Sequence, residues 1–172
     1  MSVADITLNS LTHEDIPALA AIADNRKIWK NVRDRFPSPY THEDAKNFID
    51  FLSTPSDEVT FAIRFGTELC GVCGIHPMED VYRHTAEIGY WLGEPYWGRG
   101  IASAAVDKLV QHGFEKLNLM RIQAAVFSYN EASMHVLLKN GFKHEGVMRK
   151  KVFKDGKFHD EYLFGLTNPE LE

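Results

Sequence analysis

The sequence has little cysteine, no long apolar run and no surplus of basic charge. Two cysteines among 172 residues cannot build the disulfide framework of a small secreted domain. No apolar stretch reaches the ~18–20 residues that cross a bilayer, and residues 1–5 lack a basic head followed by an apolar segment. We therefore expect a cytoplasmic protein with no membrane contact. The formal net charge of -5 argues against general nucleic-acid binding, which requires a basic face.

The sequence also lacks internal repeats, low-complexity segments and a Gly/Ser or Pro linker between halves of different composition. Hydrophobic residues make up 44% and charged residues 25%, which is typical of a globular domain and unlike a disordered chain. A length of 172 residues fits one domain. We therefore expect a single domain over residues 1–172.

Hydrophobic periodicity predicts a mixed sheet with helices packed on it. Thr12 with Asp15 and Thr41 with Asp44 have the spacing of helix N-caps, and apolar residues follow each pair at helical intervals. Alternating or continuous apolar runs predict strands at 6–8, 59–65, 69–75, 86–92 and 121–127, with two more after Phe142 that meet at Asp155-Gly156. Further helices are expected from the glycine turn at 98–100 to about residue 114, and over 130–139.

A glycine-rich turn, Trp97-Gly98-Arg99-Gly100-Ile101-Ala102-Ser103, connects the strand at 86–92 to a helix. The free backbone N–H groups and the dipole of a helix N-terminus favour an anion such as a phosphate, and glycine lets it approach the backbone. A tight connection with nothing bound is the simpler alternative. A dinucleotide-binding turn is another, but that turn opens the first βαβ unit of a parallel sheet, whereas a β-hairpin comes first here.

Several motifs together resemble the GNAT superfamily of N-acetyltransferases. They are Ala86-Glu87-Ile88-Gly89-Tyr90-Trp91-Leu92, Trp97-Gly98-Arg99-Gly100-Ile101-Ala102, Asn130-Glu131-Ala132-Ser133 and Lys139-Asn140-Gly141-Phe142. The chain is most similar to the branch of ribosomal-protein N-terminal (Rim-type) and spermidine acetyltransferases. The resemblance implies an α/β fold with a central, mostly antiparallel mixed sheet of about seven strands and helices on both faces.

The resemblance also implies an acetyl-CoA site and no metal. The turn would bind the pyrophosphate, the strand at 88–92 would lie beside the pantetheine, and Asn130 matches a position that contacts the cofactor. The implied cofactor-binding residues are Ile88, Tyr90, Leu92, Trp97, Gly98, Arg99, Gly100, Ile101, Ala102, Ser103 and Asn130. Trp97 departs from the family's usual Gln or Arg, which removes a side-chain contact but leaves the backbone amides.

Acetyl transfer to an amine requires a neutral nitrogen, whereas α-amino groups have a pKa of about 8 and alkyl amines of about 10. Glu87 is a carboxylate in an otherwise apolar strand just before the turn, and it matches a glutamate that acts as general base in some family members. Strand alternation places Glu87 on the face of Gly89 and Trp91. The alternatives are a salt-bridged strand carboxylate, or His76, His84 or a water as the base.

The departing thiolate needs a hydrogen-bond donor. The tyrosine that many family members use is replaced by Leu137, whereas Ser133 matches the serine of the Rim-type branch. A carboxylate proposed for that branch falls on Val152, so the base cannot be assigned from it. Ser133 could instead bond to its own helix backbone, and Tyr129 is a second candidate donor.

The Phe36-Pro37-Ser38-Pro39-Tyr40 loop matches the segment that walls the acceptor site in the family, so Phe36, Tyr40 and Trp91 are the expected acceptor-binding residues. We favour a protein N-terminal α-amino group as acceptor, because its lower pKa demands less of the base. Polyamines and aminoglycoside-like amines stay open, as does an inactive acetyl-CoA sensor. Homodimers are common in the family, and exposed strand edges would permit one.

A possible metal or redox motif, Cys70-Gly71-Val72-Cys73 with His76, is weak. Positions three apart on a strand point to opposite faces, and a reactive Cys-x-x-Cys normally begins a helix. We expect no metal there.

Overall fold

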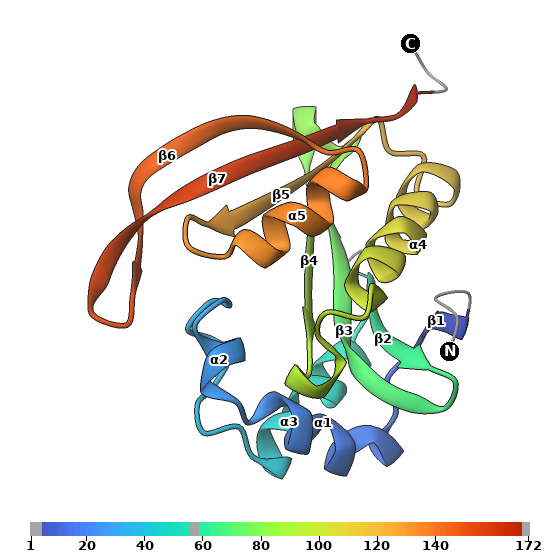
Figure 1. Cartoon of the computed structure of the whole chain (residues 1–172). Coiled ribbons are helices and arrows are strands. Elements are labelled where there is room, and N and C mark those ends of the chain that lie inside the picture. The colour runs from blue at the N-terminus through green and yellow to red at the C-terminus, as the bar shows by residue number, and fades with distance from the viewer. Residues whose placement is uncertain (1–4, 56–58, 170–172) are drawn as a thin grey trace.

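A seven-stranded sheet with helices on both faces forms the protein in a computed structural model that describes residues 5–55 and 59–169 (Figure 1). The strands are β1 (Ile6–Asn9), β2 (Val59–Phe65), β3 (Glu68–Pro77), β4 (Thr85–Leu92), β5 (Arg121–Phe127), β6 (Lys143–Lys154) and β7 (Lys157–Thr167). The helices are α1 (Ile16–Ala23), α2 (Arg26–Trp29), α3 (His42–Leu52), α4 (Ile101–Glu115) and α5 (Glu131–Lys139). The expectation of no leader rests on residues 1–5, of which the first four lie outside the described residues.

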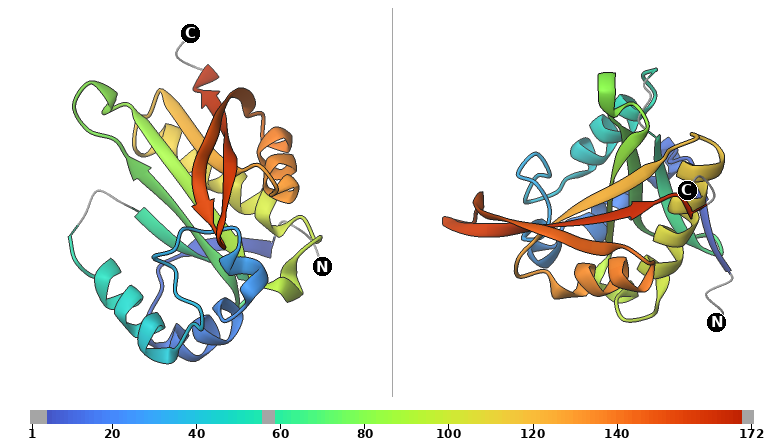
Figure 2. Two further views of the ribbon diagram at one scale, coloured as in Figure 1. Left: turned by 90° about the vertical axis from the view of Figure 1, so that its left-hand side faces the viewer. Right: turned by 90° about the horizontal axis from the view of Figure 1, so that it is seen from above.

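The sheet has the order β1-β2-β3-β4-β5-β7-β6. All neighbouring strands are antiparallel except β4 and β5, which run parallel. The two strands after Phe142 pair with each other within the chain, and their hairpin projects beyond the rest of the sheet (Figures 1 and 2). No helix in the described part of the chain is long and apolar enough to span a membrane.

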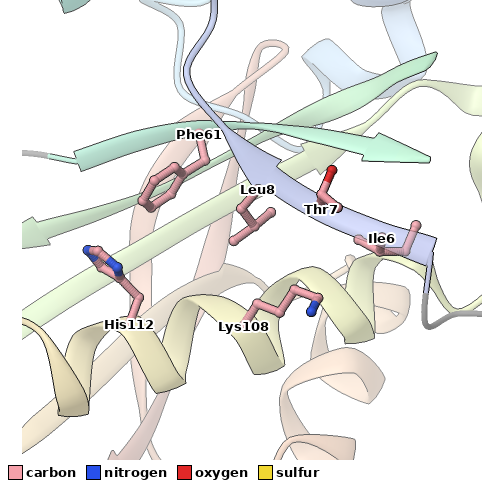
Figure 3. A pocket seen from close by; sticks show the side chains of 6 residues that line it. All are labelled: Ile6, Thr7, Leu8, Phe61, Lys108 and His112. Carbon is pink, nitrogen blue, oxygen red and sulfur yellow. The ribbon is translucent and has the colours of Figure 1, made fainter. Parts of the chain in front are cut away.

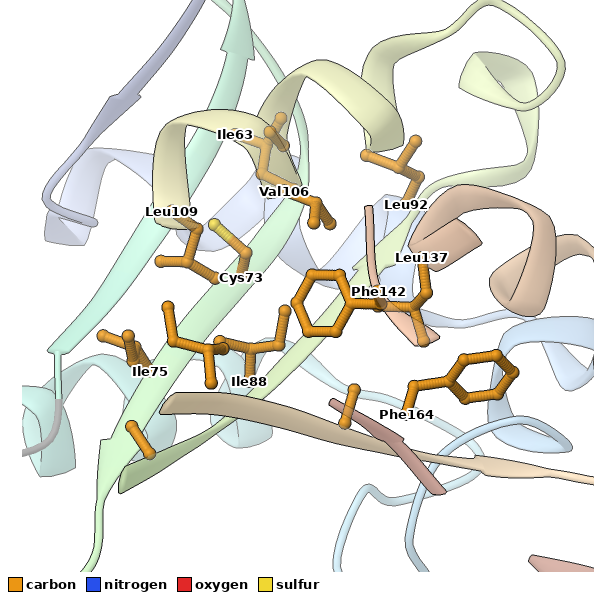
Figure 4. Close-up of a cluster of buried hydrophobic side chains, with 14 of the residues drawn as sticks. Ile63, Cys73, Ile75, Ile88, Leu92, Val106, Leu109, Leu137, Phe142 and Phe164 are labelled. Carbon is orange, nitrogen blue, oxygen red and sulfur yellow. The ribbon is translucent and has the colours of Figure 1, made fainter. Parts of the chain in front are cut away.

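Two hydrophobic clusters fill the two faces of the sheet. The larger cluster joins the sheet to α4 and α5 and includes Ile75, Ile88, Leu109, Leu137 and Phe164 (Figure 4). The smaller joins α1 and α3 to the other face and is made by Leu19, Ala20, Ala23, Tyr40, Ala45, Ile49, Ala62, Leu69 and Val72. Ala62 and Ile63 enter different clusters because successive strand residues point to opposite faces.

The helix starts follow the expected caps. The Thr41 hydroxyl accepts a hydrogen bond from the Asp44 N–H (3.2 Å), and the Asp44 carboxylate accepts one from the Thr41 N–H (2.8 Å). Asp15 likewise accepts from the Thr12 N–H (2.8 Å), although a 3-10 turn over His13–Asp15 precedes α1. These reciprocal bonds satisfy backbone donors that a helix N-terminus leaves without partners.

The short helix α2, which the sequence does not predict, holds the tip of the β6–β7 hairpin. The Lys154 ammonium lies 3.6 Å from the centre of the Trp29 ring and 2.6 Å from Asp34, and only 2% of the residue is exposed. Arg26 also contacts Trp29, with its guanidinium 4.1 Å from the centre of the ring, and it pairs with Asp155 of the hairpin tip at 2.7 Å. A buried ammonium requires such partners, so this contact fixes the hairpin against α2.

Gly71 is required by the close approach of β3 and β4. A Cβ atom at this position would lie 2.1 Å from the Trp91 carbonyl oxygen and 2.8 Å from the Leu92 Cα. Because both are backbone atoms, Gly71→Ala forces the strands apart, and we expect a loss of about 2–3 kcal/mol in the free energy of unfolding, measured by urea denaturation. Gly89→Ala on β4 is the matched control, since its Cβ would meet nothing within 4 Å. Equal unfolding midpoints for the two variants would refute this account of Gly71.

Candidate active site

An opening between β4 and β5 forms the centre of the candidate site. The two strands pair over Thr85–Arg121, Ala86–Ile122 and Glu87–Gln123, and within the described residues no further β4–β5 pair follows. Beyond this point β4 continues beside β3 to Leu92, while β5 pairs with β7 and turns away (Figure 1). The β4 edge from Ile88 to Leu92 therefore presents backbone groups to an extended ligand instead of to a strand.

The side chains along that edge are divided between the two faces. Ile88 and Leu92 are buried in the larger cluster, so only their backbone can contact a ligand in the opening. Tyr90 points to the same face and packs against that cluster. Glu87 and Trp91 belong to the opposite face, where Trp91 packs against the smaller cluster.

The glycine turn lies at the end of β4 and leads into α4. Gly98 (φ 71°) and Gly100 (φ 78°) adopt the left-handed backbone region, which only glycine enters without strain. Gly100 is the N-cap residue of the 15-residue helix α4, and no side chain caps the helix there. The first-turn N–H groups of α4 therefore form a suitable site for a phosphate.

The remaining residues of the turn shape it. The Trp97 indole N–H donates to the Leu92 carbonyl oxygen (2.8 Å), which ties the turn to the end of β4. Ile101 is buried in the larger cluster, and the Ser103 hydroxyl accepts a hydrogen bond from the Asn140 amide (3.1 Å). Arg99 is exposed and supplies positive charge beside the turn, as do the backbone amides around Ala102.

Ser133 and Tyr90 meet across the opening. The Tyr90 hydroxyl lies 2.8 Å from the Ser133 Oγ and 3.1 Å from the Ser133 carbonyl oxygen. Burial raises the pKa of Tyr90, so its phenol keeps its proton at neutral pH. Asn130 caps α5 by accepting a hydrogen bond from the Ser133 N–H (3.2 Å), which leaves its NH₂ group to donate elsewhere. Ser133 thus carries its hydroxyl in the first turn of α5, beside β4.

Glu87 lies at the other face of the opening and forms an ion pair. Its Oε1 accepts a hydrogen bond from Arg33 Nη2 (2.6 Å), and the Glu87 side chain is 33% exposed. Arg33 comes from the segment between α2 and α3, far from Glu87 in sequence. The carboxylate is therefore both ion-paired and accessible from the face that Trp91 shares.

The three aromatic residues that are predicted to bind the acceptor lie together next to the face of β4 that carries Glu87. The Phe36 ring centre is 4.9 Å from that of Tyr40 and 5.4 Å from that of Trp91, the latter edge to face. Tyr40 is only 7% exposed, and burial with the nearby Asp44 charge raises its pKa to about 12. Tyr40 therefore supports the cluster from within, and Phe36 and Trp91 are its partly exposed members.

Comparison with known proteins identifies the family. Residues 5–143 match the model described as an acetyltransferase (GNAT) domain. The chain is 32% identical over 172 residues to the uncharacterized N-acetyltransferase YoaA of Bacillus subtilis, covering 95% of this chain and 94% of that protein. This chain belongs to the GNAT acetyltransferase family.

Two further relatives of this GNAT protein support the assignment. It is 36% identical over 163 residues to the ribosomal-protein-serine acetyltransferase of Escherichia coli, covering 92% of this chain and 90% of that protein. The structure of Mycobacterium smegmatis RimJ in complex with CoA-disulfide superposes with a TM-score of 0.88 at 26% identity, covering 96% of this chain and 83% of that one. The GNAT protein is therefore an acetyl-CoA-dependent N-acetyltransferase.

The other candidate residues of the GNAT protein lie apart from the opening or are already engaged. The Tyr129 hydroxyl donates to the Lys30 carbonyl oxygen, and its ring packs edge to face on His159. Leu137 is fully buried in the larger cluster. His76 is the register partner of Glu87 on β3, whereas the His84 carbonyl accepts bonds from the Met120 and Arg121 N–H groups.

The two cysteines are buried free thiols. Burial raises the pKa of Cys73 to about 12, so the thiol stays protonated at neutral pH. Over residues 5–55 and 59–169, no group of three or more His, Cys, Asp or Glu side chains could hold a metal ion.

A surface pocket of about 350 Å³ lies on another part of the molecule, between the edge strand β1 and α4 (Figure 3). Its lining residues are Ile6, Thr7, Leu8, Phe61, Lys108 and His112. None of them borders the opening between β4 and β5, so the opening and the glycine turn identify the candidate site better than this pocket does.

Sequence reasoning missed Arg33 as the partner of Glu87 and the contact between α2 and the hairpin tip. Arg33 lies among other charged residues, Lys30, Asp34 and Arg35, and no periodicity in the sequence distinguishes it from them. Only the fold brings it to β4.

Proposed function

We propose that this GNAT protein transfers the acetyl group of acetyl-CoA to the α-amino group of a protein N-terminus. The observation that carries the proposal is the placement of Glu87 and Ser133 on the two sides of the β4–β5 opening. A thioester lying in that opening would be within reach of a proton acceptor on one face and a hydroxyl donor on the other. The similarity to a ribosomal-protein-serine acetyltransferase favours a protein acceptor.

In this proposal the glycine turn and the β4 edge hold acetyl-CoA. The backbone N–H groups of the glycine turn and of the first turn of α4, from Gly98 to Ser103, bind the pyrophosphate, and Arg99 adds a positive charge. The backbone of Ile88 to Leu92 pairs with the amide groups of the pantetheine arm. The free NH₂ group of Asn130 donates to the same arm from the start of α5.

The chemical step is a direct attack with no acyl-enzyme. Glu87 takes the proton of the acceptor ammonium, directly or through a water, so that the neutral nitrogen attacks the thioester carbon. The new N–C bond forms as the C–S bond breaks. Ser133 donates a hydrogen bond to the departing thiolate. The nitrogen loses its remaining extra proton as the amide forms, and this proton, passed directly or through water, converts the thiolate to free CoA.

The acceptor would enter over the face that carries Glu87 and Trp91. Phe36 and Trp91 form one wall, with Tyr40 behind them. The tip of the β6–β7 hairpin, where Lys154 contacts Trp29, would form the opposite rim. Arg33 pairs with the Glu87 carboxylate and fixes its position on this face.

One acetyltransferase domain over residues 1–172 would contain both binding sites. We place the protein in the cytoplasm, because acetyl-CoA and newly synthesised ribosomal proteins are found there.

The release of CoA, followed with a thiol reagent, tests the proposal. Acetyl-CoA is offered with hexapeptides that have free serine or alanine N-termini, with the same peptides blocked at the N-terminus, and with spermidine or an aminoglycoside. We expect turnover with free N-termini and none with the blocked peptides, because only the former present an α-amino group. Turnover with spermidine or the aminoglycoside alone would replace the proposed acceptor by a small amine. Acetyl-CoA binding, seen as a raised melting temperature, with silence toward every amine would favour the sensor function.

A further inference from the structure

Two glycines face each other across β3 and β4 on the side of the sheet that carries Glu87. Gly74 is the register partner of Gly89. The neighbouring pairs on the same face are Val72 with Trp91 on one side and His76 with Glu87 on the other. The face therefore has a strip without side chains between Trp91 and Glu87, which are ~13 Å apart along the strand.

This strip is open at Gly89, although β4 is the central strand of the sheet, whereas Gly74 is buried. Gly89 is exposed, and a Cβ atom built on it would meet no heavy atom within 4 Å. At Gly74 a Cβ would lie 3.2 Å from Thr60 Oγ1 and 3.1 Å from His76 Nε2, so polar side chains border the strip on the β3 side. The smaller hydrophobic cluster covers this face at Ala62 and Val72, next to the strip.

Neither packing nor backbone conformation requires glycine at position 89. Gly89 is not among the residues with positive φ, and the β3–β4 register runs without a bulge from Gly71 to Pro77. Gly71, by contrast, would bring a Cβ to 2.1 Å from a backbone oxygen. Glycine weakens a strand interior, and where neither packing nor a turn explains it, it marks a place where another chain or ligand approaches the backbone.

We propose that Gly89, with Gly74 beside it, forms the floor on which the amine-bearing end of the acceptor lies, and that the missing side chain at position 89 sets the size of acceptor accepted there. The inference rests on the proposed function, in which this face receives the acceptor. Glu87 borders the end of the floor at which the amine loses its proton. Trp91 borders the other end, from which the rest of the acceptor extends out of the site.

The test compares Gly89→Ala and Gly89→Val with the wild type. The acceptor is whichever of an N-terminal serine hexapeptide, an N-terminal alanine hexapeptide or spermidine gives the highest wild-type turnover. We expect the acceptor KM to rise about tenfold or more for Gly89→Val and less for Gly89→Ala. The melting temperature should not fall, and the acetyl-CoA Kd should not change, because the added atoms enter open space on the acceptor face.

Gly146→Val on β6 is the matched control. Its Cβ would also meet nothing within 4 Å, its φ is not positive, and β6 is the outer strand, three places from β4. A normal acceptor KM for Gly89→Val, an equal rise for Gly146→Val, or a change confined to the acetyl-CoA Kd would each overturn the inference. Failure of the proposed function is seen separately, as spermidine turnover or silence in the wild type. If the wild type shows no turnover, the Gly89→Cys variant is treated with a thiol reagent in the presence and in the absence of spermidine or the peptide. Slower reaction of the thiol at position 89 when either compound is present supports the proposed floor, and an unchanged rate overturns it.

Discussion

Glu87→Gln is expected to lower kcat by about 10²- to 10⁴-fold and to change the acetyl-CoA Kd little. The amide has the shape of the carboxylate but cannot take the proton that the acceptor ammonium must lose before its nitrogen attacks, and general-base catalysis contributes this range. The loss of the Arg33 ion pair removes at most about 1 kcal/mol of stability, because both side chains are partly exposed. The measurements are steady-state kinetics across pH and a thermal melt.

Glu145→Gln is the matched control for this variant. Glu145 is also a strand carboxylate paired with an arginine, Arg121, and that partner lowers its pKa. It lies on β6, on the other side of β5 and β7 from β4. We expect Glu145→Gln to keep full turnover. If both variants keep wild-type turnover and pH profile, Glu87 is a structural ion-pair residue, and His76 or a water becomes the candidate base.

Ser133→Ala is expected to lower kcat by about 10- to 100-fold while leaving the acetyl-CoA Kd unchanged. In the proposed reaction the hydroxyl stabilises negative charge on the departing sulfur. Removing one such donor has effects toward the low end of those seen for oxyanion sites, because a thiolate leaves readily. The helix should persist, because Asn130 caps α5 through the Ser133 backbone N–H, and alanine favours helices. Single-turnover kinetics separate this chemical step from CoA release.

The Tyr90 hydroxyl gives this prediction a second measurement. Since Tyr90 contacts Ser133 at 2.8 Å, Tyr90→Phe should lower kcat less than Ser133→Ala does, by changing the orientation of the serine hydroxyl. In the double variant the two effects should not add, because Tyr90 acts through Ser133. Tyr96→Phe, which removes a hydroxyl bonded to Glu68 (2.7 Å) and not to Ser133, should be neutral. Wild-type kcat in Ser133→Ala would show that the thiolate leaves without a hydrogen bond from Ser133.

The order of the elements is predicted from the sequence because each depends on local signals. The caps at Thr12 and Thr41 and the left-handed glycines of the turn at 98–100 involve residues within one turn of each other. Alternation along 86–92 is enough to place Glu87 opposite Ile88 and Tyr90, as the structure confirms. The family is predicted from the same local motifs and is confirmed by the comparisons.

The helix α2 shows where local signals fail. Four residues, Arg26–Trp29, are too few to show a helical period, and a helix of this length is not stable alone. Its Trp29 is held by Lys154, which in turn pairs with Asp34, 120 residues away along the chain. The sequence contains these residues, but only the hairpin returning over α2 brings them into contact.

The sequence by itself determined the fold class, the family, the glycine turn before α4 and the face of β4 that carries Glu87, because caps, glycine turns and strand alternation depend on neighbours a few residues apart. The tertiary structure decided which partners the site residues have: Arg33 for Glu87, Tyr90 for Ser133, and the open strip above Gly89. These contacts depend on where β5 leaves β4 and on how far α1 and α3 cover the sheet. Both result from packing between segments distant in sequence, which no local pattern encodes.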